Sequence, residues 1–585
     1  MTIYSFLIIV FFFLLCSGTL FLSSSSFVNA WIDPKKYAFI FCFCSILVTS
    51  ALFYIFSDVK KIKLNNIVFS VCLIISILSL LQALYGIAQF IRLFPSFGGF
   101  KVTGSYDNPA GFAACLSVAF PFLFYFLKRK EIWARIVSVS GMVAIVVAVF
   151  LSGSRAGMLA VAVVCIISFF YFFRINTKQK IVLGIFIAIL IAGLYFYKKN
   201  SADGRLLIWR CSWEMIKDKP LLGHGTGGFK ANYMKYQAIY FKEHLNTKQA
   251  MLAGNINRPF NEYIGLLVNY GLVGFLLFLL LVFYLIRSFR RIPKKSLLSY
   301  IAVWSLAAMA VFALFSYPFR YPFVWVTGLL SISVIVLQGD NGFLQNFHTI
   351  SLQRRPVKPF GNFSTMNGFA LLKIMVPVLL LFIVPVVCYK SYNNLTAEMK
   401  WCRIAHKSLA GKAEQMLPEY EKLHSKLKNN ELFLYNYAAE LNFTKHYEKS
   451  LTIAQECERL LADYDLQMLI ADNYRQLNEY EKAEQHYRKA VAMCPAKFAP
   501  LYELAKMYDS TGRSIIAVEL ARKIVEKTIK IPSPIIVAIQ NEMRQLIERV
   551  EKNDLIPEKV TKYPHQCIRQ GYSPNVQSSG DALPP

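Results

Sequence analysis

The sequence predicts an all-α, polytopic membrane protein with about eleven transmembrane helices, followed by an α-solenoid of helical repeats. Of its 585 residues, 55% are hydrophobic and only 17% are charged, which excludes a chain folded around one water-soluble core. Apolar runs of membrane-spanning length fill most of residues 1–390, and charged, amphipathic sequence follows them. We therefore expect a transmembrane domain over 1–390, a repeat domain over 391–550 and a disordered tail over 551–585.

Eleven apolar runs, each of about 20 residues, account for the membrane part. No basic residue precedes the first run, which is long and continuous, so we expect an uncleaved first span and not a removable signal peptide. The runs begin near Ile3, Tyr37, Ile67, Gly111, Ile132, Met158, Ile181, Ile264, Leu297, Phe323 and Leu371.

Basic residues predict the orientation of these spans. The formal net charge is +29, and lysine and arginine gather in every second link, at 60–63, 128–135, 174–180, 287–295 and 354–358. Because such links face the cytoplasm, the N-terminus is expected to be cytoplasmic and everything after Lys390 to lie outside the cytoplasm. The positive charge then sets the orientation of the spans and attracts anionic lipid head groups, and no nucleic acid is expected as a partner.

The same alternation places four links on the outer face: 92–109, the tight turn 152–157, the long loop 198–260, and 316–322. Arg155 and Arg320 stand in the two tight links, where an arginine is costly unless it is paired or solvated. This favours a functional role for each. The alternatives are a snorkelling helix cap for Arg155 and an interfacial anchor among aromatic residues for Arg320.

The long loop opens with a segment, 203–210, whose periodicity predicts a helix lying against the membrane with Arg205 and Arg210 near one face. A glycine-rich turn follows at 218–229. It permits close approach of a ligand, but it lacks the lysine of a nucleotide P-loop and does not follow a strand, so a plain connecting turn is the alternative. After Arg258 the chain enters the next span, in which 269–274 are expected to continue the helix.

The outer face thus offers guanidinium groups from separate segments. A guanidinium binds phosphate through two parallel hydrogen bonds and keeps its charge, which suits a diphosphate that is held and then released. Activated sugar nucleotides are cytoplasmic, so the donor that this geography permits is a lipid-linked diphosphate sugar. The arginines in question are Arg155, Arg205, Arg210, Arg258 and Arg320.

After the last span, the sequence repeats with a period of about 33 to 34 residues, which is the tetratricopeptide period. Small residues at matching positions let paired helices approach, and aromatic residues fill the grooves between pairs. Pro495 ends the middle repeat. We expect the concave surface to recruit an acceptor or a partner protein. The series Ala438, Leu441, Tyr447 and Ala454 is echoed by Ala471, Tyr474, Tyr480 and Tyr487, and then by Ala505, Tyr508 and Ala517.

In this order, the motifs on the outer face resemble those of the O-antigen ligase family over roughly residues 101–274. The resemblance implies an all-helical membrane transferase, GT-C-like in fold, in the inner membrane of a bacterium. Such enzymes move a glycan from undecaprenyl diphosphate to lipid A core, to a protein hydroxyl or to another glycan chain. It also implies transfer with inversion, without metal or cofactor, and with arginines holding the diphosphate. The matching motifs are 104–109, 154–157, Gly204-Arg205 with Trp209, 220–225 with Phe229, and 261–263 leading into 271–274.

One position departs from the family pattern, because many members carry a histidine where this chain has Phe260. Glu262, His224 and Arg258 are then the catalytic candidates. Glu262 could deprotonate an acceptor hydroxyl, the alternative being a carboxylate favoured at a helix start. His224, like His244, titrates in a suitable range, the alternative being an ordinary solvated loop histidine.

Two other functions stay open on the sequence alone. Polymerisation differs from ligation only in its acceptor, a second lipid-linked repeat unit. A transporter or flippase for the same glycans would show internal repeats and broken helices among its spans, and neither is apparent. A mere anchor for the repeats needs one span and not eleven. The twelve cysteines show no metal-ligand spacing with histidines, so neither a disulfide framework nor a metal site is expected.

Overall fold

The computed structural model describes residues 3–56, 64–173, 199–244, 247–339 and 368–553, and the single residues 179, 184, 193 and 196. Within this part of the chain all regular elements are helices, and ten are long and apolar enough to cross a membrane. The all-α, multi-pass fold class is therefore confirmed. The span predicted from Ile181 lies almost wholly outside the described residues, as do the basic clusters at 60–63 and 354–358 and the tail from 554.

The chain divides into two compact units, of which the first contains the spanning helices. This membrane unit comprises Met1–Leu194, Phe260–Tyr263 and Leu276–Met399. Its helices are α1 (Ile3–Phe21), α2 (Asp33–Phe56), α3 (Leu64–Phe90), α4 (Pro109–Leu127), α5 (Ile132–Leu151), α6 (Arg155–Phe172), α12 (Leu297–Phe315), the short η2 (Pro318–Arg320), α13 (Pro322–Gly339), most of α11 (Glu262–Arg291) and the first part of α15 (Gly368–Lys407).

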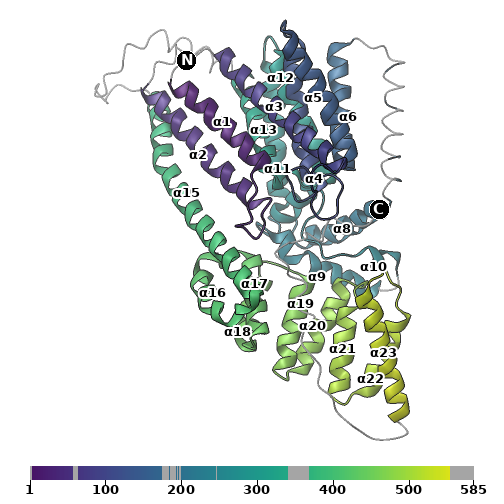
Figure 1. Ribbon diagram of the computed structural model, residues 1–585. Coiled ribbons are helices and arrows are strands. Elements are labelled where there is room, and N and C mark those ends of the chain that lie inside the picture. The colour runs from purple at the N-terminus through teal and green to yellow at the C-terminus, as the bar shows by residue number, and fades with distance from the viewer. Residues whose placement is uncertain are drawn as a thin grey trace. The chain divides into compact units, whose positions relative to one another are not determined.

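Helix α4 forms the centre of the membrane unit, between α3, α5, α6 and α12 (Figure 1). Lipid tails are as apolar as leucine, so association of membrane helices depends on close approach and on hydrogen bonds between helices. Small residues supply the close approach: a Cβ added at Gly157 of α6 would lie 2.7 Å from the Cβ of Ala113. Serines supply the bonds, as where Ser305 of α12 donates to the carbonyl oxygen of Val118 at 2.8 Å.

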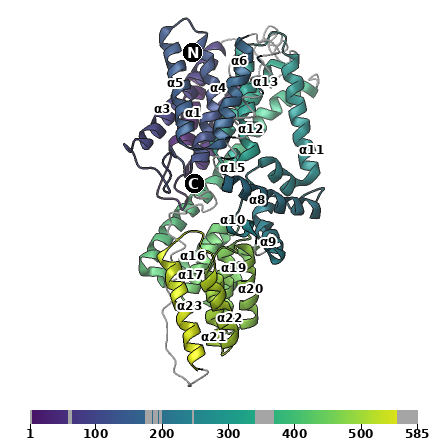
Figure 2. The same ribbon diagram turned by 90° about the vertical axis from the view of Figure 1, so that its right-hand side faces the viewer.

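The second unit comprises Tyr195–Pro259, Ile264–Phe275 and Lys400–Pro585, and we call it the loop–repeat unit. The outer loop, which the sequence assigned to the transmembrane domain, thus lies in one unit with the helices after residue 400. Its helices, seen from a second side in Figure 2, are α8 (Lys199–Asp218), α9 (Gly228–Glu243), α10 (Lys248–Leu252), the π-helix η4 (Ser408–Lys412), α16 (Ala413–Leu427), α17 (Glu431–Phe443), α18 (Tyr447–Glu458), α19 (Tyr464–Gln476), α20 (Tyr480–Met493), α21 (Ala499–Ser510), α22 (Ser514–Glu526) and α23 (Pro534–Asn553).

Helices α17 to α22 form three successive pairs. The first helices of the pairs begin at 431, 464 and 499, which are 33 and 35 residues apart. The small residues of the predicted pattern, Ala438, Ala471 and Ala505, are all fully buried. Asn430 and Asp463 cap the first helices of two pairs with side-chain oxygens that accept backbone N–H bonds. Identification of the pairs as tetratricopeptide repeats stays a prediction.

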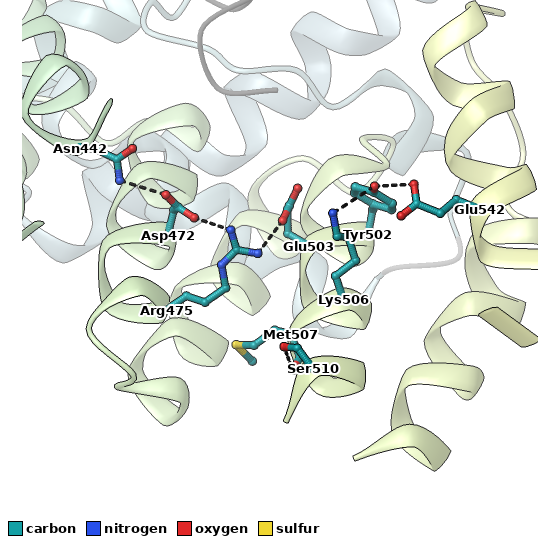
Figure 3. Close-up of polar contacts among 9 residues, drawn as sticks. All are labelled: Asn442, Asp472, Arg475, Tyr502, Glu503, Lys506, Met507, Ser510 and Glu542. Carbon is teal, nitrogen blue, oxygen red and sulfur yellow. Dashed lines mark hydrogen bonds and ion pairs between the residues drawn. The ribbon is translucent and has the colours of Figure 1, made fainter. Parts of the chain in front are cut away.

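A row of polar contacts joins the first helices of neighbouring pairs (Figure 3). Asn442 of α17 donates to Asp472 of α19 at 2.9 Å. Arg475 then bonds both Asp472, at 2.6 Å, and Glu503 of α21, at 2.9 Å. These charges are mostly buried, so each needs its partner, and the row sets the spacing between pairs.

Helix α11 is broken at Gly271, where φ is 60° and ψ is −161°. The expectation that 269–274 continue the helix is therefore wrong. The freed backbone groups pair with the glycine-rich turn in an arrangement that we call the turn–helix clamp, because a gap in a helix needs other partners for its N–H and C=O groups. Its bonds run from His224 N to Val268 O (2.8 Å), Gly225 N to Asn269 O (2.8 Å), Leu272 N to Pro220 O (2.8 Å) and Val273 N to Leu221 O (3.1 Å).

Replacing Gly271 by alanine is expected to destabilise the protein more than replacing Gly225 by alanine. Both glycines have positive φ, a conformation that costs an alanine about 1–3 kcal/mol. Only at Gly271 would the new Cβ also meet backbone, 2.3 Å from the carbonyl oxygen of Leu221, whereas nothing lies within 4 Å at Gly225. Thermal unfolding of the purified protein measures both losses, and equal losses would contradict the clamp.

Candidate functional site

Links of the membrane unit meet at the start of α4, around a buried lysine. Lys35, near the start of α2, is fully buried, and its Nζ donates to the carbonyl oxygens of Leu22 and Ser105, each at 2.8 Å. The ring of Tyr106 lies under the same ammonium group, 4.9 Å away. These contacts tie the α1–α2 link to the motif 104–109.

An ion pair lies in the same region. Arg320 Nη2 is 2.9 Å from Asp107 Oδ2, with the two side chains 15% and 5% exposed. Asn108 donates to the other oxygen of Asp107 at 2.9 Å, and the hydroxyl of Tyr321 donates to Asn108 at 3.1 Å. Arg320 was expected to meet a ligand; here an internal carboxylate already balances its charge.

Sequence reasoning missed Lys35 and Asp107, although signals for both were present. The alternation of basic links that predicts four outer-face links also predicts that the α1–α2 link lies on the outer face. Lys35 then stands at the outer end of an apolar run, and Asp107 is an acidic residue directly before a span. Charges at such positions are costly unless paired, which marks both as residues with partners.

Glu262 lies at the start of α11, beside the link that carries Arg320. Its Oε1 accepts the backbone N–H of Phe319 at 3.3 Å. Phe260, at the position where the resemblance predicted a histidine, has a φ of 52° and packs its ring 5.4 Å from that of Tyr317. A phenylalanine with positive φ stores about 1–2 kcal/mol of strain, which persists only where the surroundings fix the backbone.

Arg155 is the first residue of α6 and is partly exposed. Ser154 caps the helix by accepting the N–H of Gly157 at 3.4 Å. The positive end of the helix dipole disfavours an arginine here but favours an anion, so the guanidinium and the helix terminus attract the same ligand. This supports anion binding at Arg155 over a cap role, which Ser154 already fills.

The remaining arginines belong to the loop–repeat unit. Residues 203–210 are helical as expected, but Arg205 and Arg210 do not share a face of α8, because five residues turn a helix by about 500° and leave the two side chains about 140° apart. Arg205 is partly buried, and so is Arg258. Arg210 is exposed, with its guanidinium 5.2 Å from the ring centroid of Tyr240.

Both candidate histidines take part in local contacts. His224 Nε2 lies 2.9 Å from the carbonyl oxygen of Met215, so this nitrogen carries the proton and the lone pair is on Nδ1. Nearby, Tyr236 donates its hydroxyl hydrogen bond to Asp218, and burial together with this bond raises the pKa of Tyr236. His244 Nδ1 lies 2.8 Å from the carbonyl oxygen of Tyr240, with the two rings stacked at 4.4 Å.

Helix α9 is held by the repeats through contacts that the sequence did not reveal. Lys230 forms an ion pair with Glu431, and its carbonyl oxygen accepts the N–H of Ala462 at 3.0 Å. Gln237 donates to the carbonyl oxygen of Met493 at 2.6 Å. At the end of the loop, Asn255 donates to Asp463 at 2.8 Å. Loop and repeats are thus joined by both side-chain and backbone bonds.

Comparison with known protein families gives a match over part of the chain. Residues 140–279 match the O-antigen ligase family model. The matched segment contains the turn 152–157, the long loop, Glu262 and the break in α11. The match supports the O-antigen ligase superfamily, and with it a membrane glycan ligase or polymerase that transfers glycosyl groups.

One curated relative is also similar to part of the chain. It is an uncharacterized protein from Haemophilus influenzae, 30% identical in an alignment that covers 25% of this chain and 43% of that protein. The chain therefore spans less than half the length of this relative.

In the part of the chain that the structure describes, no three His, Cys, Asp or Glu side chains are grouped to hold a metal ion.

Replacing Asp107 by alanine is expected to destabilise the protein by about 3 kcal/mol, because Arg320 is then left with a mostly buried, unpaired charge. Thermal or denaturant unfolding in detergent measures the loss. The matched control removes both charges: Asp107→Leu with Arg320→Met is expected to be more stable than Asp107→Ala. A double variant that loses more than the single one would show that the ion pair is not the reason.

Exchange of Lys230 and Glu431 tests the tie between loop and repeats. Lys230→Glu alone sets two carboxylates against each other and is expected to speed proteolytic cleavage within 199–259, whereas adding Glu431→Lys restores the wild-type rate. Limited proteolysis with mass spectrometry reads both rates. Lys422→Glu, in an exposed pair with Glu419 on α16, is the control and should leave cleavage unchanged. Unchanged cleavage in Lys230→Glu would contradict the tie.

Proposed function

We propose that this protein transfers a glycan from undecaprenyl diphosphate to an acceptor hydroxyl, on lipid A core or on a protein, at the periplasmic face of a bacterial inner membrane. The observation that carries the proposal is the family match over 140–279, because this segment contains most of the chemical groups that the proposal needs. They are Arg155, Arg205, Arg210, Arg258 and Glu262.

Arginines hold the donor in this proposal. Arg155, Arg205 and Arg210 are the proposed donor-binding residues. Charge grows on the diphosphate as the bond to the sugar breaks, and fixed guanidinium groups stabilise such charge without reorganisation. Arg155 is the best supported of the three, since the dipole of α6 adds to its attraction for an anion. Arg320 also lies on this face, and we assign it to orienting the link 316–321 through Asp107.

Glu262 is the proposed general base. It takes the proton of the acceptor hydroxyl while the acceptor oxygen attacks the anomeric carbon. The bond from that carbon to the diphosphate oxygen breaks, and undecaprenyl diphosphate leaves with the electron pair. Because the acceptor attacks from the face opposite the diphosphate, the sugar configuration inverts. The hydrogen bond from Phe319 N–H holds one carboxylate oxygen and orients the group. His224, through its Nδ1, is the alternative base, and Arg258 is the remaining catalytic candidate.

The acceptor decides between ligation and polymerisation. Ligation is favoured because a helical repeat region, which suits binding of a protein, lies in the same unit as the donor-binding loop. The break in α11 brings transport back into consideration, since transporters bind substrate at broken helices. However, the clamp pairs both ends of this break with the protein's own turn, so those backbone groups already have partners.

The test is transfer by purified full-length protein, with a chelator present, from undecaprenyl diphosphate-linked glycan to a panel of acceptors. Arg155→Ala and Arg205→Ala are each expected to lower kcat/KM by about 100-fold, and Glu262→Gln to lower kcat by about 100-fold or more. Arg522→Ala removes an exposed arginine from α22 and serves as the control, with unchanged activity expected.

The acceptor consumed names the reaction. Transfer to lipid A core or protein would establish a ligase, and transfer to a second lipid-linked unit a polymerase. Transfer that occurs without the chelator but not in its presence would contradict metal independence. Donor binding without transfer to any acceptor would overturn the enzyme and favour transport.

A further inference from the structure

Helix α8 exposes one face on which apolar and basic residues alternate. Leu206, Arg210, Trp213 and Lys217 leave the helix within about 60° of one another, as their spacing of three and four residues requires. Leu206 and Trp213 are 52% and 55% exposed. The opposite face, which includes Leu207, Cys211 and Met215, is buried in the unit. Among the described residues of this face, Arg210 lies against the ring of Tyr240 and Lys217 pairs with Glu214, while the apolar side chains Leu206 and Trp213 stay more than half exposed.

The exposed apolar surface continues beyond α8 into the turn–helix clamp. Leu221 and Leu222 are 62% and 73% exposed, and Leu272 and Val273 across the clamp are 46% and 45% exposed. The clamp bonds join these two segments directly. Leu272 and Val273 belong to α11, whose length and composition are those of a membrane-spanning helix. The apolar surface of α8 is thus continuous with residues of a helix that has the length and composition of a membrane span.

The basic residues on this surface indicate which part of the bilayer it meets. Tryptophan, arginine and lysine on the apolar face of a helix are typical of the membrane–water boundary, where the rings lie among the head groups and the cations reach the phosphates. Between Lys199 and Pro259, ten lysine and arginine residues stand against four aspartate and glutamate residues. This balance favours anionic head groups over zwitterionic ones.

We propose that α8 and the turn after it form a membrane-contact surface that lies in the head-group region of the outer leaflet, in addition to the spanning helices. The occupant of the surface is phospholipid: Leu206, Trp213, Leu221 and Leu222 contact the upper acyl chains, and Lys217 contacts the phosphates. The contact anchors the loop–repeat unit to the bilayer at a second place, independent of the covalent links to the spans.

Quenching of Trp213 fluorescence tests the proposal in the full-length protein. The chain has seven tryptophans, so the emission of Trp213 is taken as the difference between wild type and Trp213→Phe. Both are placed in nanodiscs of phosphatidylglycerol and phosphatidylethanolamine, with or without bromine on the upper acyl carbons. We expect brominated lipid to quench the difference signal at least twofold and aqueous iodide to leave it nearly unchanged. Trp401, 3% exposed and bonded to Asn436, gives the control difference signal, which neither quencher should reach.

A second pair of variants shows whether the apolar residues make the contact. Leu222→Glu is expected to reduce the lipid quenching of Trp213. Ile515→Glu makes the same kind of apolar-to-charged change at an 87% exposed position of α22 and is expected to leave the quenching unchanged. Quenching of Trp213 by iodide, or by neither quencher, would overturn the proposal. The readout needs no glycan transfer, so its outcome is independent of the proposed function.

Discussion

A break within an apolar helix is possible only if the freed backbone groups find other partners, and this constraint determines much of the architecture of the protein. At Gly271 the partners come from the turn 219–225, whose N–H and C=O groups bond with both ends of the broken helix. Both sides need glycine: a Cβ at Gly223 would lie 2.5 Å from the carbonyl carbon of Asn269, and one at Gly271 would lie 2.3 Å from the carbonyl oxygen of Leu221. The turn between α8 and α9 is thereby held to α11.

The charges at the start of α4 follow the same logic in another form. Lys35, Asp107 and Arg320 are all largely buried, which is tolerable only because each is paired or bonded to carbonyl oxygens. Each contact joins segments far apart in the chain, such as Lys35 and Ser105, which are 70 residues apart. These polar contacts between links therefore fix one arrangement of the membrane helices, whereas apolar packing alone would allow several.

The sequence predicts the features that depend on local composition and misses those that depend on distant partners. Spans and helical pairs follow from run length and period. Ten of the eleven predicted spans were found where expected, and helices pair along the described residues 431–526 with a similar period. The break in α11 could not be predicted, because 269–274 read as ordinary apolar helix and the groups that stabilise the break lie about 50 residues earlier. The tie between Lys230 and Glu431 joins residues 201 positions apart and leaves no local signal. The prediction that Arg205 and Arg210 share a face of the helix was wrong for a local reason, because the rotation of about 100° per residue already separates the two side chains.

The contacts between loop and repeats also bear on what the repeats can do. Glu431 is the first residue of α17, Ala462 precedes α19 and Met493 is the last residue of α20, so the polar contacts that hold α9 involve helix ends. The concave face of stacked helix pairs is formed by helix sides. Holding the loop and binding a partner therefore use different surfaces. Because the loop carries Arg205, Arg210 and Arg258, a partner bound to the repeats would belong to the same unit as these arginines. Under the proposed function, a recruited acceptor would then share a scaffold with two of the proposed donor-binding arginines, Arg205 and Arg210. Such an arrangement suits a ligase more than a polymerase, whose acceptor arrives on its own lipid.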